Sequence, residues 1–151
     1  MKKKLTAYML MLLMFCMTLF SGCGATEEQG YEESQTDVYT IEEDGWYYST
    51  EDVALYLYTY GELPDNFITK KEAQSMGWDN KKGNLWEVAD GMCIGGDHFG
   101  NYEGLLPEED DYTECDVNYE GGYRGAERII FSDDGDIYYT GDHYESFEQL
   151  Y

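Results

Sequence analysis

Residues 112–140, which read YTECDVNYEGGYRGAERIIFSDDGDIYYT, decide the fold. Three runs in this stretch are rich in aromatic and β-branched residues, and they cover 112–119, 127–132 and 136–140. Two turns that contain glycine, EGG and DDG, follow the first and the second run. Runs of this kind, joined by such turns, are typical of neighbouring antiparallel strands. Residues 92–98 and a short segment near Phe147 have the same character, so we predict an antiparallel sheet from residue 92 onward.

Helix-start signals lie upstream of these strands. Ser49 precedes two acidic residues and a run of apolar residues, and Gly61 ends this first helical pattern. Thr69 and Glu72 have the spacing of a capping box, which predicts a second helix, and residues 84–88 predict a third, short one. Helices followed by an antiparallel meander indicate the α+β class. We therefore expect N-terminal helices packed on a C-terminal antiparallel β-sheet.

The composition describes a folded and strongly acidic chain. Its 151 residues include 32 Asp and Glu against nine Lys and Arg, which gives a formal net charge of −23. Aromatic residues make up 17 %, enough large side chains to build a core, so global disorder is excluded. The charge also excludes proteins that grip nucleic acid with a broad basic face.

The N-terminus has the pattern of an export signal. Three lysines precede a nearly unbroken apolar run to residue 20, which is short for a membrane-spanning helix and suits a signal peptide. The following Ser-Gly-Cys resembles a bacterial lipobox, which predicts a signal over 1–22 and lipidation of Cys23; ordinary secretion with cleavage near Ala25 is the alternative. Residues 23–44 are acidic and predict an extended tether, and 45–151 form the predicted domain.

Several short motifs identify the domain by resemblance. They are LPDNFITK (63–70), EAQ (72–74), GW (77–78), KGNL (82–85), IGGD (94–97) and DHY (142–144). In this collinear order, from about residue 49 to 147, they closely resemble the microbial guanyl-specific ribonucleases, in particular their barnase branch. The resemblance implies the microbial ribonuclease fold and an extracellular endoribonuclease that needs no metal or other cofactor. Such an enzyme cleaves single-stranded RNA 3′ to guanosine by transesterification to a 2′,3′-cyclic phosphate, which it then hydrolyses.

The resemblance also assigns roles in catalysis. Attack of a ribose 2′-hydroxyl on the adjacent phosphate needs a base, an acid for the departing 5′-oxygen, and cations around the phosphorane. Glu114 matches the family's general base and His143 its general acid. The matching cations are Lys70, Arg124 and Arg128.

Each assignment has a plainer alternative. Without the resemblance, Glu114 is one surface carboxylate among 32, and His143 is a surface or core histidine. Arg124 and Arg128 have the spacing to pair with Asp116 and Glu127. Removal of the three N-terminal lysines leaves six basic residues against 32 acidic ones, however, and three of those six fall at phosphate-handling positions. The other three, Lys71, Lys81 and Lys82, are interpreted as solvated surface charges.

Guanine recognition has its own set of matching positions. One carboxylate can accept both the N1–H and the N2–H₂ of guanine, while backbone N–H groups bind O6. The substrate-binding positions are Glu103 for the carboxylate, Gly100 and Asn101 for the backbone donors, Phe99 and Tyr144 for packing around the base, and Asp97 on the active-site side. Tyr102 departs from the family pattern because a well-known relative has arginine there, and residues 108–111 form a shorter, acidic loop. A surface-tethered nucleotide- or protein-binding module with weakened catalysis is therefore the alternative function.

Metal sites and partners follow from the same analysis. Residues 133–136 lack the ligand spacing of a calcium loop and predict a hairpin turn, and His98 is expected to be a surface residue at a strand end. No metal site is expected. The expected partners are an RNA substrate, a membrane through a lipid on Cys23, and a cognate inhibitor protein, and the chain is expected to be a monomer outside the cytoplasm.

Cys93 and Cys115 are predicted to be free thiols. Counting alternate residues along 92–98 places Cys93 on the face of Asp97, the active-site side. Because Glu114 points to that same side in the next strand, Cys115 must point into the core. Side chains on opposite faces of a sheet cannot form a disulfide without backbone movement.

Overall fold

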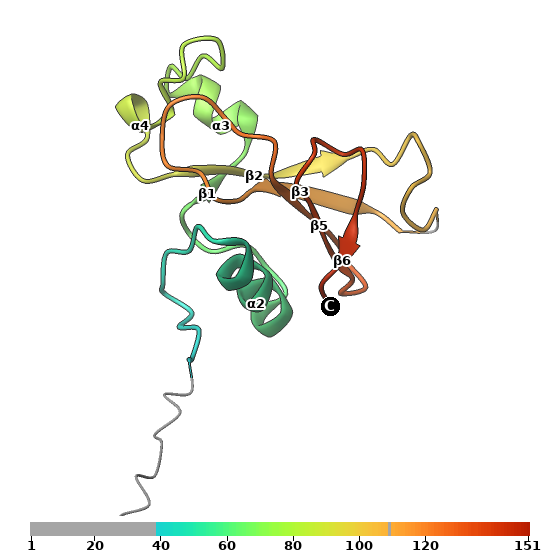
Figure 1. The fold of residues 1–151 in the computed structure, drawn as a ribbon. Helices are drawn as coiled ribbons and strands as arrows, with labels where there is room; N and C mark the ends of the chain where they lie inside the picture. Colours follow the sequence, from blue (N-terminus) through green and yellow to red (C-terminus); the bar gives the residue numbers. More distant parts are fainter. Residues whose placement is uncertain (1–38, 109) are drawn as a thin grey trace, which may run out of the picture. The chain divides into compact units, whose positions relative to one another are not determined.

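A computed structural model describes residues 39–108 and 110–151 of the chain. Two helices and six strands dominate the fold, with one further helical turn (Figure 1). The elements are α2 (Thr50–Tyr60), β1 (Phe67–Ile68), α3 (Lys70–Ser75), α4 (Leu85–Val88), β2 (Cys93–Phe99), β3 (Tyr112–Asp116), β4 (Arg128–Ser132), β5 (Ile137–Thr140) and β6 (Glu148–Gln149).

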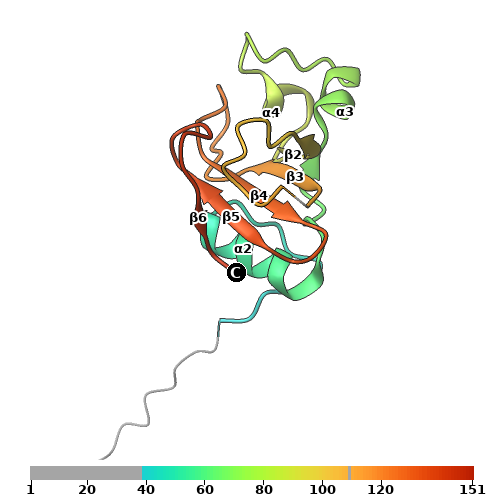
Figure 2. The same cartoon turned by 90° about the vertical axis from the view of Figure 1, so that its right-hand side faces the viewer.

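The strands form one sheet in sequence order, β1-β2-β3-β4-β5-β6. Figure 2 shows the strands from β2 to β6 following one another across this sheet. Every pair from β2 to β6 is antiparallel, which confirms the predicted α+β class and meander. The exception is β1, a strand that we did not predict, because Phe67 and Ile68 pair in parallel with Cys93 and Ile94 of β2.

The predicted start signals of α2 and α3 are confirmed. The Ser49 side chain accepts a hydrogen bond from the Asp52 amide, and α2 ends at Gly61, whose φ is 74°. In α3, Thr69 and Glu72 form the reciprocal capping box. Each cap satisfies amides that have no partner within their own helix. The predicted third helix is α4, a single turn without a side-chain cap at Asn84.

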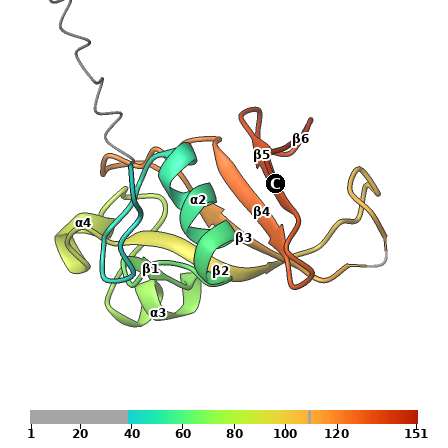
Figure 3. The same cartoon turned by 90° about the horizontal axis from the view of Figure 1, so that it is seen from below.

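Helix α2 covers one face of the sheet, as the view from below shows (Figure 3). Its Val53, Ala54 and Leu57 pack against Cys115, Val117, Ile129 and Ile137 from β3, the residues after it, β4 and β5. A second buried cluster lies around α3, α4 and β2 and includes Trp78, Leu85 and Cys93. A third cluster, Leu106, Tyr112, Ile130 and Tyr138, lies toward the far end of β3.

The residues just before α2 pack onto that helix. Tyr39 Oη donates to Asp52 at 2.8 Å, Tyr60 Oη to the Ile41 carbonyl at 2.9 Å, and Tyr56 Oη to the Glu43 carbonyl at 2.8 Å. Ile41 is itself buried. Residues 39–44, which we assigned to the tether, thus make contacts within the folded unit, and the expected domain start at residue 45 lies inside the packed region.

A β-bulge in β2 overturns one step of the cysteine argument. Gly95 pairs with Cys115, but Asp97 pairs with Glu114, so one extra residue is inserted at Gly96, whose φ is 88°. The insertion reverses the alternation of faces, and Cys93 therefore lies on the core side with Cys115, not with Asp97. The conclusion itself is confirmed, because both thiols are free and Cys115 is buried. Cys93, expected on the active-site side, is buried as well.

The predicted signal, Cys23 and most of the tether lie outside the described residues. Among the helices of residues 39–108 and 110–151, none has the length and apolar character that crossing a membrane requires.

Candidate active site

The sheet face opposite α2 carries the candidate site. Residues 112, 114 and 116 alternate with the core-facing residues of β3, so Tyr112, Glu114 and Asp116 share this face. Cross-strand partners extend it, because Ile130 lies opposite Glu114 and Arg128 opposite Asp116. The bulge in β2 adds Asp97, which pairs with Glu114. A short row of charged residues, Asp97, Glu114, Asp116 and Arg128, therefore runs along this face of the sheet.

Glu114 is a buried carboxylate with two side-chain donors. Its side chain is 8 % exposed, Lys70 Nζ donates to Oε1, and Tyr144 Oη donates to Oε2 at 2.6 Å. Burial by itself would raise the pKa of Glu114, but the hydrogen bonds from Lys70 and Tyr144 and the charges of Lys70 and Arg124 outweigh it. The net pKa of Glu114 lies below its usual value, so the group is an ionised acceptor at neutral pH.

Asp116 holds the two arginines. Arg124 binds it in a bidentate pair, with Nε at 2.6 Å from Oδ2 and Nη2 at 2.6 Å from Oδ1. Arg128 Nε lies 2.8 Å from Oδ1 as an ionic contact outside hydrogen-bond geometry, and its Nη1 donates to the carbonyls of Gly125 and Glu127. The alternative pairing with Asp116 is therefore present for both arginines. Each guanidinium carries five N–H donors, so this pairing leaves donors for a substrate phosphate.

Asp97 positions Lys70 through the backbone. Asp97 Oδ2 accepts a hydrogen bond of 2.9 Å from the Lys70 amide, the first residue of α3. The capping box of Thr69 and Glu72 also holds the first turn of α3. Lys70 thus enters the site from the start of a helix that is bonded to β2. Asp97, which the resemblance placed among the substrate-binding residues, uses its Oδ2 to hold this helix start.

The loop between β5 and β6 carries His143 and Tyr144. Both residues have positive φ, 60° and 75°, which is uncommon for side chains of this size. Asp142 organises the turn: its carboxylate accepts from Thr140 Oγ1, the amides of Glu145 and Ser146, and Ser146 Oγ. These bonds hold the pKa of Asp142 down at about 2. His143 is exposed and lies beside Tyr144, with 4.9 Å between their ring centroids.

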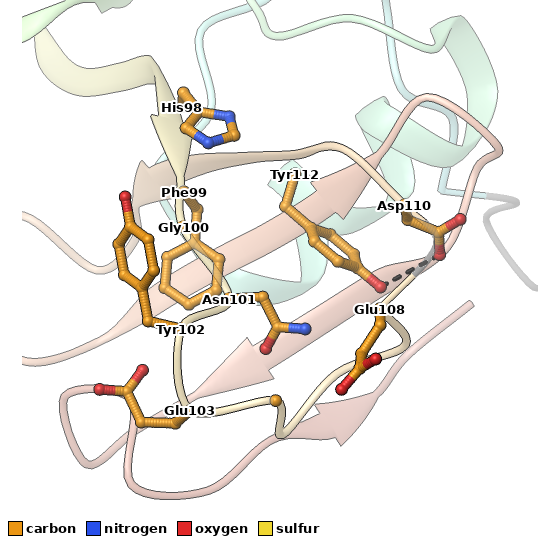
Figure 4. A pocket seen from close by; sticks show the side chains of 10 residues that line it. His98, Phe99, Gly100, Asn101, Tyr102, Glu103, Glu108, Asp110 and Tyr112 are labelled. Carbon is orange, nitrogen blue, oxygen red and sulfur yellow. Dashed lines mark hydrogen bonds between the residues drawn. The ribbon is translucent and has the colours of Figure 1, made fainter.

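Three of the predicted guanine-binding positions, Gly100, Asn101 and Glu103, lie in the loop after β2. A pocket of about 470 Å³ is lined by ten residues, among them Gly100, Asn101, Tyr102 and Glu103 (Figure 4). The Asn101 side chain ties the loop together, since its Nδ2 donates to the Leu106 carbonyl at 2.7 Å and its Oδ1 accepts from the Leu106 amide at 3.1 Å. His98, expected only as a surface residue, is exposed and also lines this pocket.

A neighbouring pocket connects this loop to His143. It has a volume of about 430 Å³ and is lined by Phe99, Glu103, Leu105, His143, Tyr144 and Glu145. Phe99 stacks on Tyr144 with 5.3 Å between centroids and an interplanar angle of 28°. Glu103, the candidate guanine-binding carboxylate, and His143, the candidate general acid, therefore line the same pocket. Tyr144 also lines it and connects it to Glu114 through its hydrogen bond.

The structure brings most of the predicted residues together. Lys70, Glu114 and Tyr144 are in direct contact, and the charge of Arg124 acts on Glu114. Sequence reasoning missed the bond from Tyr144 to Glu114 and named Asp116 only as a plain pairing partner. Within residues 39–108 and 110–151, no three His, Cys, Asp or Glu side chains are grouped as a metal site would require.

Comparisons with known proteins identify similar ribonucleases. The sequence model of the ribonuclease family matches residues 50–151. The chain is 39 % identical to a ribonuclease of Bacillus intermedius, over 98 % of this chain and 99 % of that protein. It is 51 % identical to a ribonuclease of Heyndrickxia coagulans, over 65 % of this chain and 92 % of that protein.

A further match carries a base preference in its name. Guanyl-specific ribonuclease St of Saccharopolyspora erythraea is 48 % identical over 52 residues, which cover 32 % of this chain and 52 % of that protein. The family match, the similarity along the chain and the α+β fold agree with one another. The chain is therefore a ribonuclease, and it belongs to the family of microbial guanyl-specific ribonucleases, in its barnase-like branch.

Proposed function

We propose that this ribonuclease cleaves single-stranded RNA on the 3′ side of guanosine in two steps. In the first step the ribose 2′-oxygen attacks the adjacent phosphorus, the P–O5′ bond breaks, and a 2′,3′-cyclic phosphate forms. In the second step water opens the cyclic ester to a 3′-phosphate. The observation that carries this proposal is the buried Glu114 carboxylate, held by Lys70 and Tyr144 beside the Asp116–Arg124–Arg128 cluster.

Glu114 and His143 exchange the protons in this scheme. Glu114 accepts the proton of the 2′-hydroxyl, and His143 donates one to the departing 5′-oxygen. In hydrolysis the roles reverse: His143 takes a proton from water and Glu114 returns one to the 2′-oxygen. The positive groups of Lys70, Arg124 and Arg128 stabilise the phosphorane, which carries more negative charge than the ground state.

Binding of the substrate phosphate should raise the pKa of Glu114, which makes its carboxylate a stronger base. Lys70 and Tyr144 both donate to the free carboxylate and lower its pKa. A bound phosphate competes for the same donors, and each donor that moves to phosphate raises the pKa of Glu114. The carboxylate is therefore a weak base in the empty site and a stronger base when the phosphate is in place.

The preference for guanine rests on Glu103. Its carboxylate can accept the N1–H and N2–H₂ of guanine, whereas adenine has no N1–H. Glu103 lines both the pocket at the loop after β2 and the pocket that contains His143. Phe99, stacked on Tyr144, offers an aromatic surface for any base and so contributes affinity more than choice.

Export and lipidation complete the proposal. The charged start, the apolar run and the Ser-Gly-Cys sequence support a signal over residues 1–22 and a lipid on Cys23. The protein then acts outside the cytoplasm, at the outer face of the cell membrane. Metabolic labelling with a fatty acid tests the lipid: label on the wild type and none on Cys23→Ala is the expected result, and an unlabelled secreted wild type contradicts lipidation.

Cleavage of guanylyl-uridine tests the chemistry. The wild type should yield the 2′,3′-cyclic phosphate, and Glu114→Ala and His143→Gln should each lose most of the activity, since one proton transfer contributes about 10²–10⁴-fold. The wild-type kcat/KM should follow a bell-shaped pH profile, and His143→Gln should lose the alkaline limb. Chelator should leave the rate unchanged; a rate restored only by divalent metal contradicts the mechanism.

Adenylyl-uridine and Glu103→Gln test the base preference. The wild type should prefer the guanylyl substrate strongly, and Glu103→Gln should lose most of that preference while cleaving the adenylyl substrate no more slowly. Equal rates on both substrates in the wild type contradict guanine recognition. Absence of cyclic product from any substrate would instead support the binding-module alternative.

A further inference from the structure

The basic residues of the described chain are gathered at one end of the site. Lys70 contacts Glu114, and Arg124 pairs with Asp116 further along β3. Figure 1 shows the loop between β3 and β4 beside α3 and α4, while residues 100–108 extend from the opposite end of the sheet. The other Lys and Arg side chains of residues 39–108 and 110–151 belong to α3, to the loop that follows it and to the start of β4, and they are Lys71, Lys81, Lys82 and Arg128. All six therefore lie at Glu114 or toward the Asp116 end of β3.

The opposite end of the site, beside Tyr112, has no Lys or Arg. Neither residues 98–112, which include the guanine-binding loop, nor residues 129–151 contain one. A Cβ built on Gly104 would lie 3.6 Å from Glu108 Oε1, so this carboxylate lies next to the residue that follows Glu103. Asp110 accepts a hydrogen bond of 3.1 Å from Tyr112 Oη. Figure 4 shows Glu103, Glu108 and Asp110 around the same pocket.

This uneven charge acts differently on the two phosphates that flank a guanosine within an RNA strand. The 3′-phosphate is the one that is cleaved, and it lies at Glu114 among the cations. The 5′-phosphate is carried by the same ribose as the guanine, so it must stay close to the loop that binds the base. There it meets Glu108 and Asp110 and no Lys or Arg. Carboxylates within about 10 Å of a phosphate repel it measurably at low salt, because the Debye length then exceeds their separation.

We infer that the site selects guanosine that has no phosphate on its 5′ side, an inference that rests on the proposed function. The favoured substrates are RNA strands whose 5′-terminal nucleoside is an unphosphorylated guanosine, and a guanosine inside a strand is cleaved more slowly. Glu108 and Asp110 are the residues that set this preference. They act by repulsion of the unfavoured substrate, while Glu103 selects the base by hydrogen bonding.

Two substrates that differ only in the 5′-phosphate test the preference. They are GpU and pGpU, and the measured quantity is the ratio of their kcat/KM values at pH 8, where histidine side chains are uncharged. The wild type should favour GpU roughly three- to tenfold at 0.01 M salt, and the ratio should approach one at 1 M, where the Debye length is about 3 Å. GpU with a 5′-O-methyl group, which adds bulk without charge, should be cleaved as fast as GpU.

Variants that change the charge at this end should change the ratio. Glu108→Gln combined with Asp110→Asn should bring it close to one at 0.01 M salt. Tyr102→Lys, at a position that is 92 % exposed in the same loop, should lower it as well. The matched control is Glu43→Gln combined with Glu62→Gln, which removes two carboxylates from a separate pocket beside α2 and should leave the ratio at its wild-type value.

Binding of two 2′-deoxy ligands separates this inference from the proposed function, because neither can be cleaved. Calorimetry should show that the wild type binds 2′-deoxyguanosine 3′-phosphate more tightly than 2′-deoxyguanosine 3′,5′-bisphosphate at 0.01 M salt, and that the Glu108→Gln, Asp110→Asn variant binds both equally. This result supports the preference even in a chain that cleaves no guanylyl substrate, and such a chain refutes the proposed function alone. Equal wild-type rates on GpU and pGpU at low salt overturn the preference. A 5′-O-methyl substrate as slow as pGpU also overturns it, because size rather than charge would then be responsible.

Discussion

Glu114 shows how one residue can be buried, charged and reactive. Burial of a lone carboxylate is costly, and here two hydrogen-bond donors and the charge of Arg124 offset that cost. The donors are not structural alone, since Lys70 Nζ and Tyr144 Oη point at the atoms that must accept a proton. Any change in either donor should therefore be visible in the pH dependence of the reaction.

Tyr144→Phe is the sharpest change of this kind. The Tyr144 hydroxyl lowers the pKa of Glu114, so its removal raises that pKa and moves the acid limb of the kcat/KM profile to higher pH. On the acid side kcat/KM should fall about tenfold, as expected for one hydrogen bond to a charged group of about 1.5 kcal/mol. Tyr58→Phe on α2, whose ring stacks on Tyr151, serves as the control. An acid limb that stays in place would mean that the hydroxyl does not act on Glu114.

Residue types and their order predicted the candidate residues but not their contacts. The motifs around Lys70, Glu114 and His143 are distinctive in the sequence, and each falls in or beside the site. The bond from Tyr144 to Glu114 spans thirty residues of sequence, and no local pattern specifies it. Asp116 was foreseeable only as a nearby acid, because one carboxylate shared by two arginines depends on how β3 and β4 pair.

At the scale of an element, the loop after β5 depends on Asp142. Four hydrogen bonds meet on this exposed carboxylate and hold His143 and Tyr144 in left-handed backbone conformations. Such conformations persist only where surrounding contacts enforce them.

Asp142→Asn should change how stability depends on pH. The folded pKa of Asp142, about 2, lies below its ordinary value of 3.8, so its charge contributes stability that is complete above about pH 4 and lost as the pH falls through 2. The variant should therefore lose less stability than the wild type between those pH values, while being less stable near neutral pH. Thermal unfolding across this range measures the difference, with Asp111→Asn, another exposed aspartate, as the control. Parallel curves for wild type and Asp142→Asn would contradict this role.

Gly83→Ala should displace the loop that carries Arg124. The added Cβ would lie 2.8 Å from the Gly122 carbonyl carbon, and the backbone there has a positive φ. Gly61→Ala is a matched control, because Gly61 has a φ of 74° and no atom within 4 Å of its added Cβ. Both variants should lose about 1 kcal/mol or more of stability from backbone strain, but only Gly83→Ala should also lower kcat/KM. Equal activities in the two variants would show that the contact between the loops does not position Arg124.

Predictability at this scale depends on the length of each element. The helices α2 and α3 carry caps that are visible in the sequence, and β2 to β5 have clear strand composition. The two-residue strand β1 has no periodicity to detect, and its parallel partner is set by tertiary packing. The bulge at Gly96 shifts the faces of β2 by one residue, which is why alternation placed Cys93 on the wrong side.

For the whole molecule, net charge and local charge act in opposite directions. The chain carries −23, yet Lys70, Arg124 and Arg128 are gathered on one face of the sheet. The attraction of this cluster is short in range, while the repulsion between the other carboxylates and RNA extends further. Salt should screen the longer-range repulsion first, since the Debye length falls from about 30 Å at 0.01 M to about 10 Å at 0.1 M.

The rate on long RNA should therefore rise with salt before it levels or falls. Most basic nucleic-acid-binding proteins show the reverse, because salt weakens their attraction to phosphates. Guanylyl-uridine, with one phosphate, should respond far less than long RNA. Measuring kcat/KM for both substrates from 0.01 to 0.1 M salt decides between the two behaviours. A steady decrease on long RNA would mean that the cationic cluster, not the net charge, governs encounter.

The two buried free thiols, Cys93 and Cys115, can be used to detect local opening of the folded unit. Burial raises the pKa of Cys93 to about 12 and that of Cys115 well above its ordinary value, so neither forms the reactive thiolate while its surroundings stay closed. Cys93 belongs to the cluster around α3 and α4, and Cys115 to the cluster beneath α2. The rate at which an alkylating reagent labels each sulfur then measures how often the surrounding cluster opens. Different labelling rates for Cys93 and Cys115 would show that the two clusters open separately.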